Sequence, residues 1–119
     1  MAKIMIVDDS PADLRFMSEI LRQTPHTVTQ VQGSADVEVR ASADVPDLIL
    51  LDVVMPDRNG YEVLRSLKRQ DSTRDVKVVF VSSKGGDTDI KWGLRQGAVD
   101  YLIKPYTADQ VMTVLKKHL

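Results

Sequence analysis

Carboxylate, hydroxyl and ammonium side chains follow four short apolar runs of this sequence: they are Asp8, Asp9, Asp52, Ser82 and Lys104. If the three carboxylates lie within several Å of one another, each ionised pair costs about 1 kcal/mol in water and about 4 kcal/mol near a protein surface. They must therefore take up a proton or bind a cation. Oxygen ligands without histidine or cysteine favour Mg²⁺ or Mn²⁺ over zinc or copper. With an ammonium and a hydroxyl group added, the set suits a phosphoryl group, whose oxygens need a metal ion, a cation and a hydrogen-bond donor.

Asp52 is the best candidate for a nucleophile in this set, because it is single and central. A carboxylate can attack phosphorus and form an acyl phosphate. Each residue alone also has an ordinary structural explanation: an acid after a strand is usually a cap or a turn residue, and Asp8 and Asp9 could complement the dipole of a following helix. The whole set is the stronger signal, because unrelated polar residues would scatter over both edges of a sheet.

The apolar runs predict five β-strands that alternate with stretches of helical length: Ile4–Val7, Val28–Val31, Leu48–Leu51, Val76–Val81 and Val99–Ile103. The third and fourth runs lack polar alternation, which is typical of central strands that are covered on both faces. Alternating strands and helices indicate an α/β fold, a doubly wound parallel sheet in a three-layer sandwich with right-handed connections. With the strand order 2-1-3-4-5, the first and third strands are neighbours, so that Asp8, Asp9 and Asp52 converge at the carboxyl edge.

Start signals and apolar spacing predict the helices. Ser10 followed by Pro11 predicts the start of one helix, Asn59 the start of a second and Thr107 the start of the last. Gly97 is typical of the residue just after the end of a helix, here the one that precedes the fifth strand. Their apolar faces are predicted to be Leu14, Met17, Ile20 and Leu21; Val63, Leu64 and Leu67; and Ala108, Val111, Met112, Leu115 and Leu119. Residues 34–42 alternate like a strand, and we interpret them as a helix only because the flanking strands need a crossover.

Length and composition limit the class of protein. The 119 residues (13.3 kDa) leave room for one domain, and 16 Lys and Arg against 17 Asp and Glu give a net charge of −1. No overall field attracts nucleic acid or an acidic membrane surface. The absence of cysteine excludes disulfides, thiolate zinc sites and cysteine nucleophiles. The first apolar run is too short for a signal peptide or a membrane span.

Five motifs contain or flank the candidate residues: Ile6-Val7-Asp8-Asp9-Ser10, Leu50-Leu51-Asp52-Val53-Val54-Met55-Pro56, Asn59-Gly60-Tyr61-Glu62, Phe80-Val81-Ser82-Ser83 and Tyr101-Leu102-Ile103-Lys104-Pro105. In these motifs, and over essentially its whole length, the sequence closely resembles the receiver domain of bacterial two-component response regulators, particularly the stand-alone CheY-like kind. The resemblance implies a flavodoxin-like (CheY-like) fold, a single receiver domain over residues 1–119 with no output domain, and a bacterial cytoplasmic location.

The resemblance also implies a role for each candidate residue. Asp52 would accept a phosphoryl group from a histidine kinase or phosphotransfer protein, in a signalling protein that is not otherwise an enzyme. Mg²⁺ or Mn²⁺ would be held by Asp9, Asp52 and the Val54 backbone carbonyl, with Asp8 contributing through water. Lys104 would pair with the phosphoryl group, and the bond to Pro105 would be cis. Ser82 and Tyr101 would move on phosphorylation.

The expected output is docking of a protein target on the face formed by the fourth helix, the fifth strand and the fifth helix, with these exposed candidates: Lys91, Arg95, Tyr101 and Lys116. The oligomeric state would be a monomer or a phosphorylation-dependent dimer. The segment from Lys91 to Leu102 resembles regulators of type IV pilus twitching systems (the PilH-like group), which implies a role in motility or chemotaxis-like control. We interpret Trp92 as a packing residue in preference to a partner contact.

Alternative functions stay open at this point. A phosphate sink would drain a shared kinase and bind no target, and it differs in gaining no affinity when phosphorylated. A haloacid-dehalogenase-like phosphatase would need an Asp-x-Asp pair on its first strand and usually a cap insertion, and this sequence has neither. DNA binding is disfavoured because no helix-turn-helix or basic stripe is present. Nucleotide binding is disfavoured because the sequence has no G-x-G-x-x-G and no Walker lysine.

Overall fold

Strands and helices alternate along the whole chain in the computed structural model, which describes residues 1–119. The elements are β1 (Lys3–Asp8), α1 (Pro11–Leu21), β2 (Thr27–Gln32), α2 (Val37–Asp44), β3 (Leu48–Asp52), α3 (Gly60–Arg69), β4 (Lys77–Ser82), α4 (Asp87–Arg95), β5 (Asp100–Ile103) and α5 (Ala108–His118). The five strands are parallel and lie in the order β2-β1-β3-β4-β5. The predicted fold class and strand order are confirmed.

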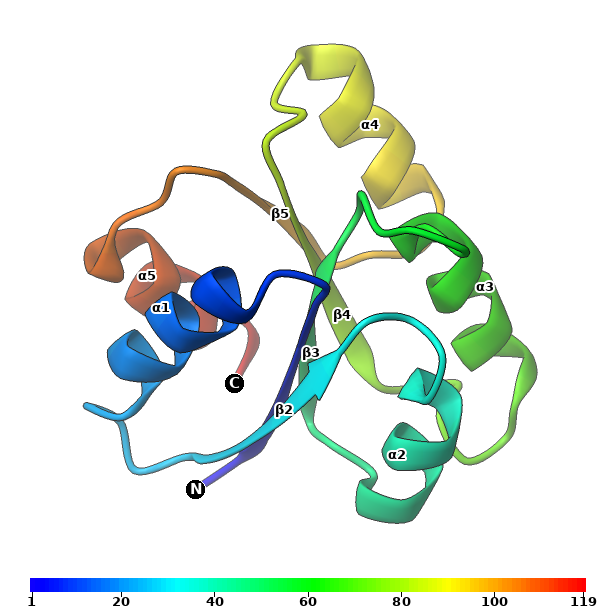
Figure 1. The fold of residues 1–119 in the computed structure, drawn as a ribbon, viewed down its shortest axis with the longest axis horizontal. Coiled ribbons are helices and arrows are strands. Elements are labelled where there is room, and N and C mark those ends of the chain that lie inside the picture. Colours follow the sequence, from blue (N-terminus) through cyan, green and yellow to red (C-terminus); the bar gives the residue numbers. More distant parts are fainter.

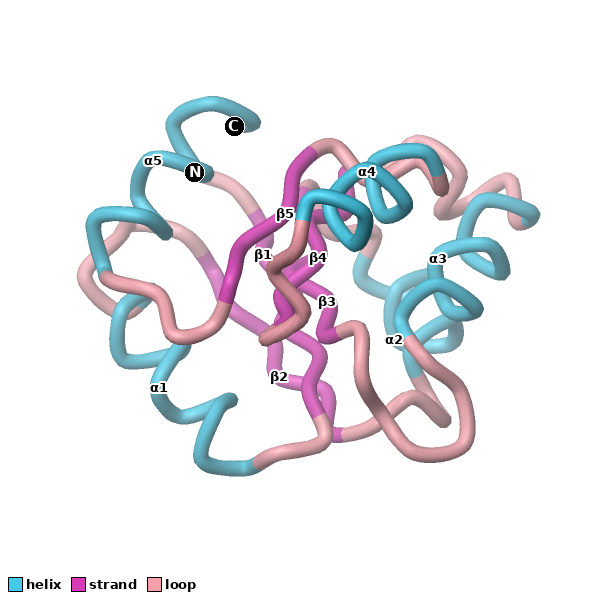
Figure 2. The backbone as a smooth tube through the Cα atoms, turned by 90° about the horizontal axis from the view of Figure 1, so that it is seen from above, coloured by secondary structure: helices cyan, strands magenta, loops and turns pink.

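The helices form a layer on each face of the sheet. Helices α1 and α5 lie on one face, and α2, α3 and α4 lie on the other (Figures 1 and 2). The two chain ends lie on the side of α1 and α5 (Figure 1). None of the helices has the length and apolar character that crossing a membrane requires.

The central strands hold the molecule together because their side chains alternate between two hydrophobic cores. In β1, Met5 and Val7 belong to the core under α2 and α3, whereas Ile4 and Ile6 belong to the core under α1 and α5. All of these side chains are buried, and burial of each contributes roughly 1.5–3 kcal/mol. The same alternation in β3 and β4 leaves their carboxyl ends rigidly placed, which is what a site at that edge requires.

Three helices begin where the sequence predicts. Ser10 Oγ accepts a hydrogen bond from the Asp13 backbone N–H at 3.2 Å, and Pro11 follows as the first helical residue. Asn59 and Thr107 form capping boxes with the residues three positions later. The predicted apolar faces of α1 and α3 are buried. The prediction for α5 is wrong at its two ends: Ala108 and Leu119 are exposed, because Ala108 is the first residue of the helix and Leu119 lies beyond its last residue, His118.

Helix α2 starts later than expected. Residues 34–36 are not helical, the helix begins at Val37, and the Asp36 side chain makes no capping hydrogen bond. The physical reason lies in the preceding loop: Gly33 has φ +81°, and Ser34 is buried with its hydroxyl directed at the β3–α3 loop. The loop therefore uses residues that the alternating pattern would place in a helix.

Helix α4 is held by little apolar burial. Its one buried residue is Gly93, while Trp92 and Leu94 are 47% and 43% exposed. A Cβ atom added at Gly93 would lie 3.0 Å from ring carbons of both Phe80 and Tyr101. The glycine, which lowers helix propensity by roughly 1 kcal/mol relative to alanine, thus allows the helix to lie directly on these two rings. The predicted end of this helix is confirmed, since Gly97 follows it with φ +114°.

Candidate functional site

The carboxyl ends of β1 and β3 bring three carboxylates together. These strands are neighbours in the sheet, with Val7 opposite Leu51. One carboxylate oxygen each from Asp8, Asp9 and Asp52 lies within 4.8 Å of the others. Asp8 and Asp52 are 7% and 4% exposed, so that two of the three carboxylates are withdrawn from water. The convergence that the sequence predicts from strand order is present in the structure.

Asp52 is in an environment that disfavours its charge. Burial and the neighbouring Asp8 carboxylate raise the pKa of Asp52 to about 7. Lys104 opposes this shift, since its Nζ atom lies 3.4 Å from Asp52 Oδ1, but it offsets only part of it. A divalent cation bound by the three carboxylates would relieve the repulsion, and their oxygen donors are those that Mg²⁺ prefers.

Lys104 is the cationic centre of the site. Its Nζ atom donates to Asp8 Oδ2 at 2.9 Å and to Asp13 Oδ2 at 3.0 Å. Burial lowers the pKa of Lys104, but these hydrogen bonds and the nearby Asp52 outweigh it, so that the pKa is raised overall. The backbone N–H of Lys104 donates to the Ser82 carbonyl at 2.8 Å, and the peptide bond to Pro105 is cis.

Ser82 and Tyr101 lie beside the carboxylates and share a partner. The Ser82 side chain is fully buried at the end of β4, and its Oγ atom accepts a hydrogen bond from the Lys84 backbone N–H at 3.1 Å. The Tyr101 hydroxyl donates to the Lys84 carbonyl at 2.6 Å. Burial raises the pKa of the Tyr101 hydroxyl. The loop after β4 is thus tied to both side chains, although Tyr101 is half-buried rather than exposed as the sequence suggested.

The loop between β3 and α3 carries Val54. This residue is 53% exposed, and its carbonyl accepts no hydrogen bond within the protein. Both ends of this loop are fixed. The Gly60 N–H donates to the Val53 carbonyl at 2.8 Å, and a Cβ at Gly60 would lie 2.4 Å from the Asp52 carbonyl oxygen. Only a glycine permits this close approach of α3 to the end of β3.

We expect Gly60→Ala to destabilise the protein by about 1–3 kcal/mol, because the added methyl group overlaps the backbone of Asp52 and one of the two must move. Urea unfolding measures the effect. Gly33→Ala is a matched control that has open space around the new Cβ but strains a positive φ. Equal stability of Gly60→Ala and the wild type would contradict the close approach.

The structure gathers most of the predicted site residues and adds others. Asp8, Asp9, Asp52 and Lys104 form one cluster, and Ser82 and Tyr101 are linked to each other through the Lys84 backbone. Asp13 is not among the predicted site residues; it lies in the first turn of α1, and the structure shows it as a partner of Lys104. No local pattern links it to Lys104, which is 91 positions away in the sequence.

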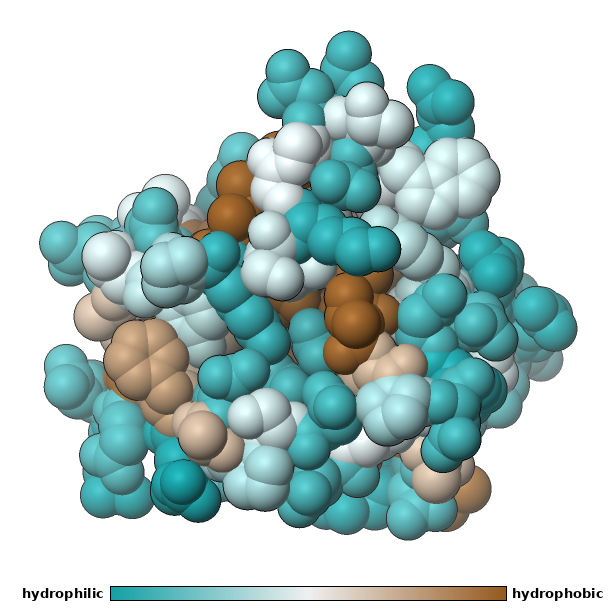
Figure 3. Space-filling model, turned by 45° about the horizontal axis from the view of Figure 1, so that its top comes forward, coloured by the Kyte–Doolittle hydropathy of each residue, from teal (hydrophilic) through white to brown (hydrophobic).

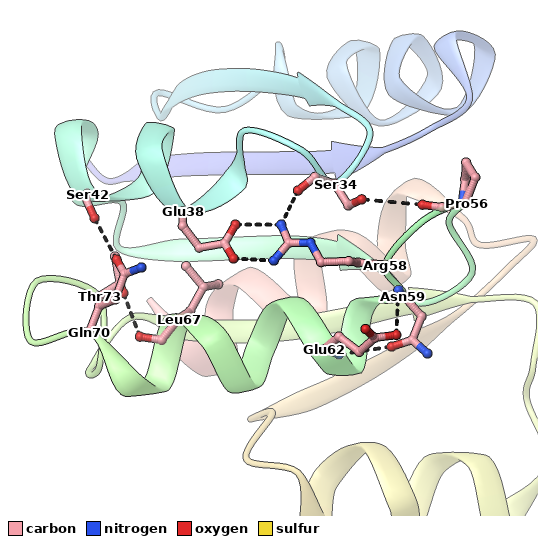
Figure 4. A network of polar contacts seen from close by, with 10 residues as sticks. All are labelled: Ser34, Glu38, Ser42, Pro56, Arg58, Asn59, Glu62, Leu67, Gln70 and Thr73. Atoms are coloured by element: carbon pink, nitrogen blue, oxygen red, sulfur yellow. Dashed lines mark hydrogen bonds and ion pairs between the residues drawn. The ribbon is translucent and has the colours of Figure 1, made fainter.

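An ion pair between Arg58 and Glu38 was not predicted at all. It joins the β3–α3 loop to α2 (Figure 4). The two residues are 20 positions apart in the sequence, in a loop and in the helix that was hardest to predict.

Comparison with known proteins identifies the family. The model of the response regulator receiver domain matches residues 4–116. The chain is 36% identical over 115 residues to protein PilH of Pseudomonas aeruginosa, covering 97% of this chain and 95% of PilH. Several other relatives are longer, and the chain spans only 24–26% of their length.

Solved structures agree with this result. The chemotaxis response regulator CheY4 of Vibrio cholerae superposes with a TM-score of 0.92 over 100% of this chain and 99% of that one, at 24% identity, which supports the fold. The receiver domain of sensor histidine kinase PA1611 from Pseudomonas aeruginosa, solved with a magnesium ion coordinated in its active-site cleft, has a TM-score of 0.89 at 26% identity and covers 98% of this chain and 96% of that one. The chain belongs to the response regulator receiver domain family of two-component signalling systems.

Proposed function

We propose that this receiver domain accepts a phosphoryl group on Asp52 from a histidine kinase or phosphotransfer protein. The observation that carries the proposal is the position of Asp52: at the end of the central strand β3, among two further carboxylates and 3.4 Å from the Lys104 ammonium. An Asp52 oxygen attacks the phosphorus of a phosphohistidine, the P–N bond breaks, and its electron pair goes to the imidazole nitrogen, leaving an acyl phosphate.

The remaining residues hold the incoming group and balance its charge. Asp9, Asp52 and the Val54 carbonyl would hold Mg²⁺, with Asp8 contributing through water, and the ion would supply positive charge to the phosphoryl oxygens. Mn²⁺ would serve with the same ligands. Lys104 must leave Asp8 and Asp13 at least in part to pair with the phosphoryl group. The Ser82 hydroxyl would donate a hydrogen bond to it.

We propose that the signal is carried by the loop after β4. Because Ser82 and Tyr101 both bond to Lys84, a movement of Ser82 toward the phosphoryl group would loosen the contact that holds the Tyr101 hydroxyl. Tyr101 packs against Gly93, so that a change in its position would reach α4, which has little other buried surface. This coupling supplies the movable element that a phosphorylation switch needs.

The docking face for a downstream protein is proposed on α4, β5 and α5. Lys91, Arg95 and Lys116 are exposed there, as the sequence predicts. Apolar side chains are also exposed on or beside α4 and β5: Trp92, Leu94, Val99 and Ile103. Figure 3 shows a largely hydrophilic face with separate hydrophobic patches, which suits a partner that binds reversibly. The similarity to PilH supports a role in motility control. We further propose that the protein acts in the bacterial cytoplasm, as a monomer or phosphorylation-dependent dimer.

The proposal is tested by incubating the protein with a small-molecule phosphodonor and Mg²⁺ or a chelator, and measuring its intact mass. We expect one phosphoryl group to be added with Mg²⁺ and little or none with the chelator. Proteolysis and mass spectrometry then locate the group, and modification at any residue other than Asp52 would overturn the assignment. A pull-down with phosphorylated and unphosphorylated protein separates a docking regulator, which gains affinity for a target, from a phosphate sink, which does not.

A further inference from the structure

Arg58 makes the most extensive side-chain contact outside the carboxylate site. Its guanidinium donates two hydrogen bonds to Glu38, one to each carboxylate oxygen, with 2.8 Å between Nη2 and Oε1. The same Nη2 atom also donates to the Ser34 backbone carbonyl. Figure 4 shows Arg58 reaching from the β3–α3 loop across to α2. A two-point pair of this kind fixes orientation as well as distance.

The pair is partly buried, which makes it more than a surface contact. The side chains of Arg58 and Glu38 are 32% and 15% exposed. The hydrogen bonds from Arg58 hold the pKa of Glu38 at about 2, against the effect of burial, so that the carboxylate stays charged across the ordinary pH range. Exposed ion pairs typically contribute little to stability, whereas loss of one partner from a buried pair leaves a charge that water cannot fully solvate.

A second contact joins the β3–α3 loop to Ser34, in the loop between β2 and α2. The buried Ser34 hydroxyl donates to the Pro56 carbonyl at 3.4 Å (Figure 4). The Arg58 backbone N–H donates to the same carbonyl at 2.9 Å. The residues between Asp52 and Gly60 are therefore held from the side of α2 as well as at both ends. Val54 lies within this held segment, two residues before Pro56, and its carbonyl has no partner in the protein.

We propose that Arg58 and Glu38 are positioning residues for the metal site, because they hold the β3–α3 loop in the conformation in which the Val54 carbonyl can serve as a ligand. This inference rests on the proposed magnesium site and extends it to two residues that do not touch the ion. Without the pair, the loop would keep its fixed ends and the Ser34–Pro56 contact but lose the rest of its lateral support. Ordering Val54 would then cost free energy when the ion binds, and the binding would be weaker. Mutation of residues that support metal ligands without touching the ion typically lowers metal affinity by about 10–100-fold.

The test is Mg²⁺ titration calorimetry on Glu38→Gln, Arg58→Met, the double variant and the wild type. We expect each single variant to bind Mg²⁺ roughly tenfold more weakly than the wild type. The double variant should bind no more weakly than either single one, because both substitutions remove the same pair. Arg58→Lys keeps the charge but loses the two-point contact, and should recover only part of the affinity.

Glu19→Gln is the matched control, since Glu19 pairs with Arg22 at 3.1 Å on the exposed side of α1 and touches neither loop. It should bind Mg²⁺ like the wild type. Circular dichroism and urea unfolding show that each variant is folded under the titration conditions. A role in stability alone predicts a lower unfolding midpoint with unchanged Mg²⁺ affinity, and that result overturns the positioning role while leaving the magnesium site intact. A wild type that does not bind Mg²⁺ overturns both.

Discussion

Replacing Asp52 with alanine is expected to abolish phosphorylation by a small-molecule donor and by a cognate kinase. Asp52 is the central carboxylate of the cluster, and Lys104 Nζ lies 3.4 Å from its Oδ1 atom. In the variant, Asp8 keeps its contact with Lys104 at 2.9 Å, but it lies at the end of the neighbouring strand. An attack on phosphorus needs the nucleophile, the ammonium and the metal ligands in one arrangement, and no second carboxylate reproduces it.

Intact-mass spectrometry after incubation with donor and Mg²⁺ gives the result directly. Asp71→Ala serves as the matched control, because Asp71 is an almost fully exposed carboxylate that follows α3, outside the cluster. It should be phosphorylated like the wild type. Equal phosphorylation of Asp52→Ala and the wild type would remove Asp52 from the proposed reaction.

Asp52→Asn is expected to stabilise the protein above neutral pH when no metal ion is present. The pKa of Asp52 is raised from 3.8 to about 7 by burial and by Asp8. Between these values the folded state keeps the proton and the unfolded state has lost it, so that the stability of the wild type falls as the pH rises from about 4 to about 7. By about pH 8 this loss of stability corresponds to about 4 kcal/mol, since each pKa unit of the shift is worth about 1.4 kcal/mol. Asparagine has no proton to lose and escapes this loss.

Urea unfolding in a chelating buffer, between about pH 5 and pH 8, measures this effect. The stability of Asp52→Asn relative to the wild type should increase with pH over that range. Mg²⁺ should then stabilise the wild type, by about 2.7 kcal/mol at 100 times its dissociation constant, and should stabilise the variant less. A difference between the two proteins that does not change with pH would contradict the account of Asp52 as a carboxylate buried beside a like charge.

The main elements of the fold could be predicted from sequence because their signals are local. Strands β3 and β4 are continuous apolar runs, and Ser10, Asn59 and Thr107 supply helix caps within three residues of the groups they bond. Helix α2 was misplaced by three residues at its start, because Ser34 is buried by a contact with Pro56, 22 positions away in the sequence. No local pattern contains that contact.

The sequence by itself determined the parallel sheet and the location of Asp8, Asp9 and Asp52 at one of its edges, because parallel strands place their carboxyl ends at one edge whatever the details of packing. Only the tertiary structure decided which side chains surround that meeting point. The contacts of Asp13 with Lys104, of Gly93 with Phe80 and Tyr101, and of Arg58 with Glu38 each depend on how a loop or helix packs against a distant element. Such contacts depend on how side chains from distant parts of the chain fit together within a few Å. The spacing of residues along the sequence does not reveal that fit.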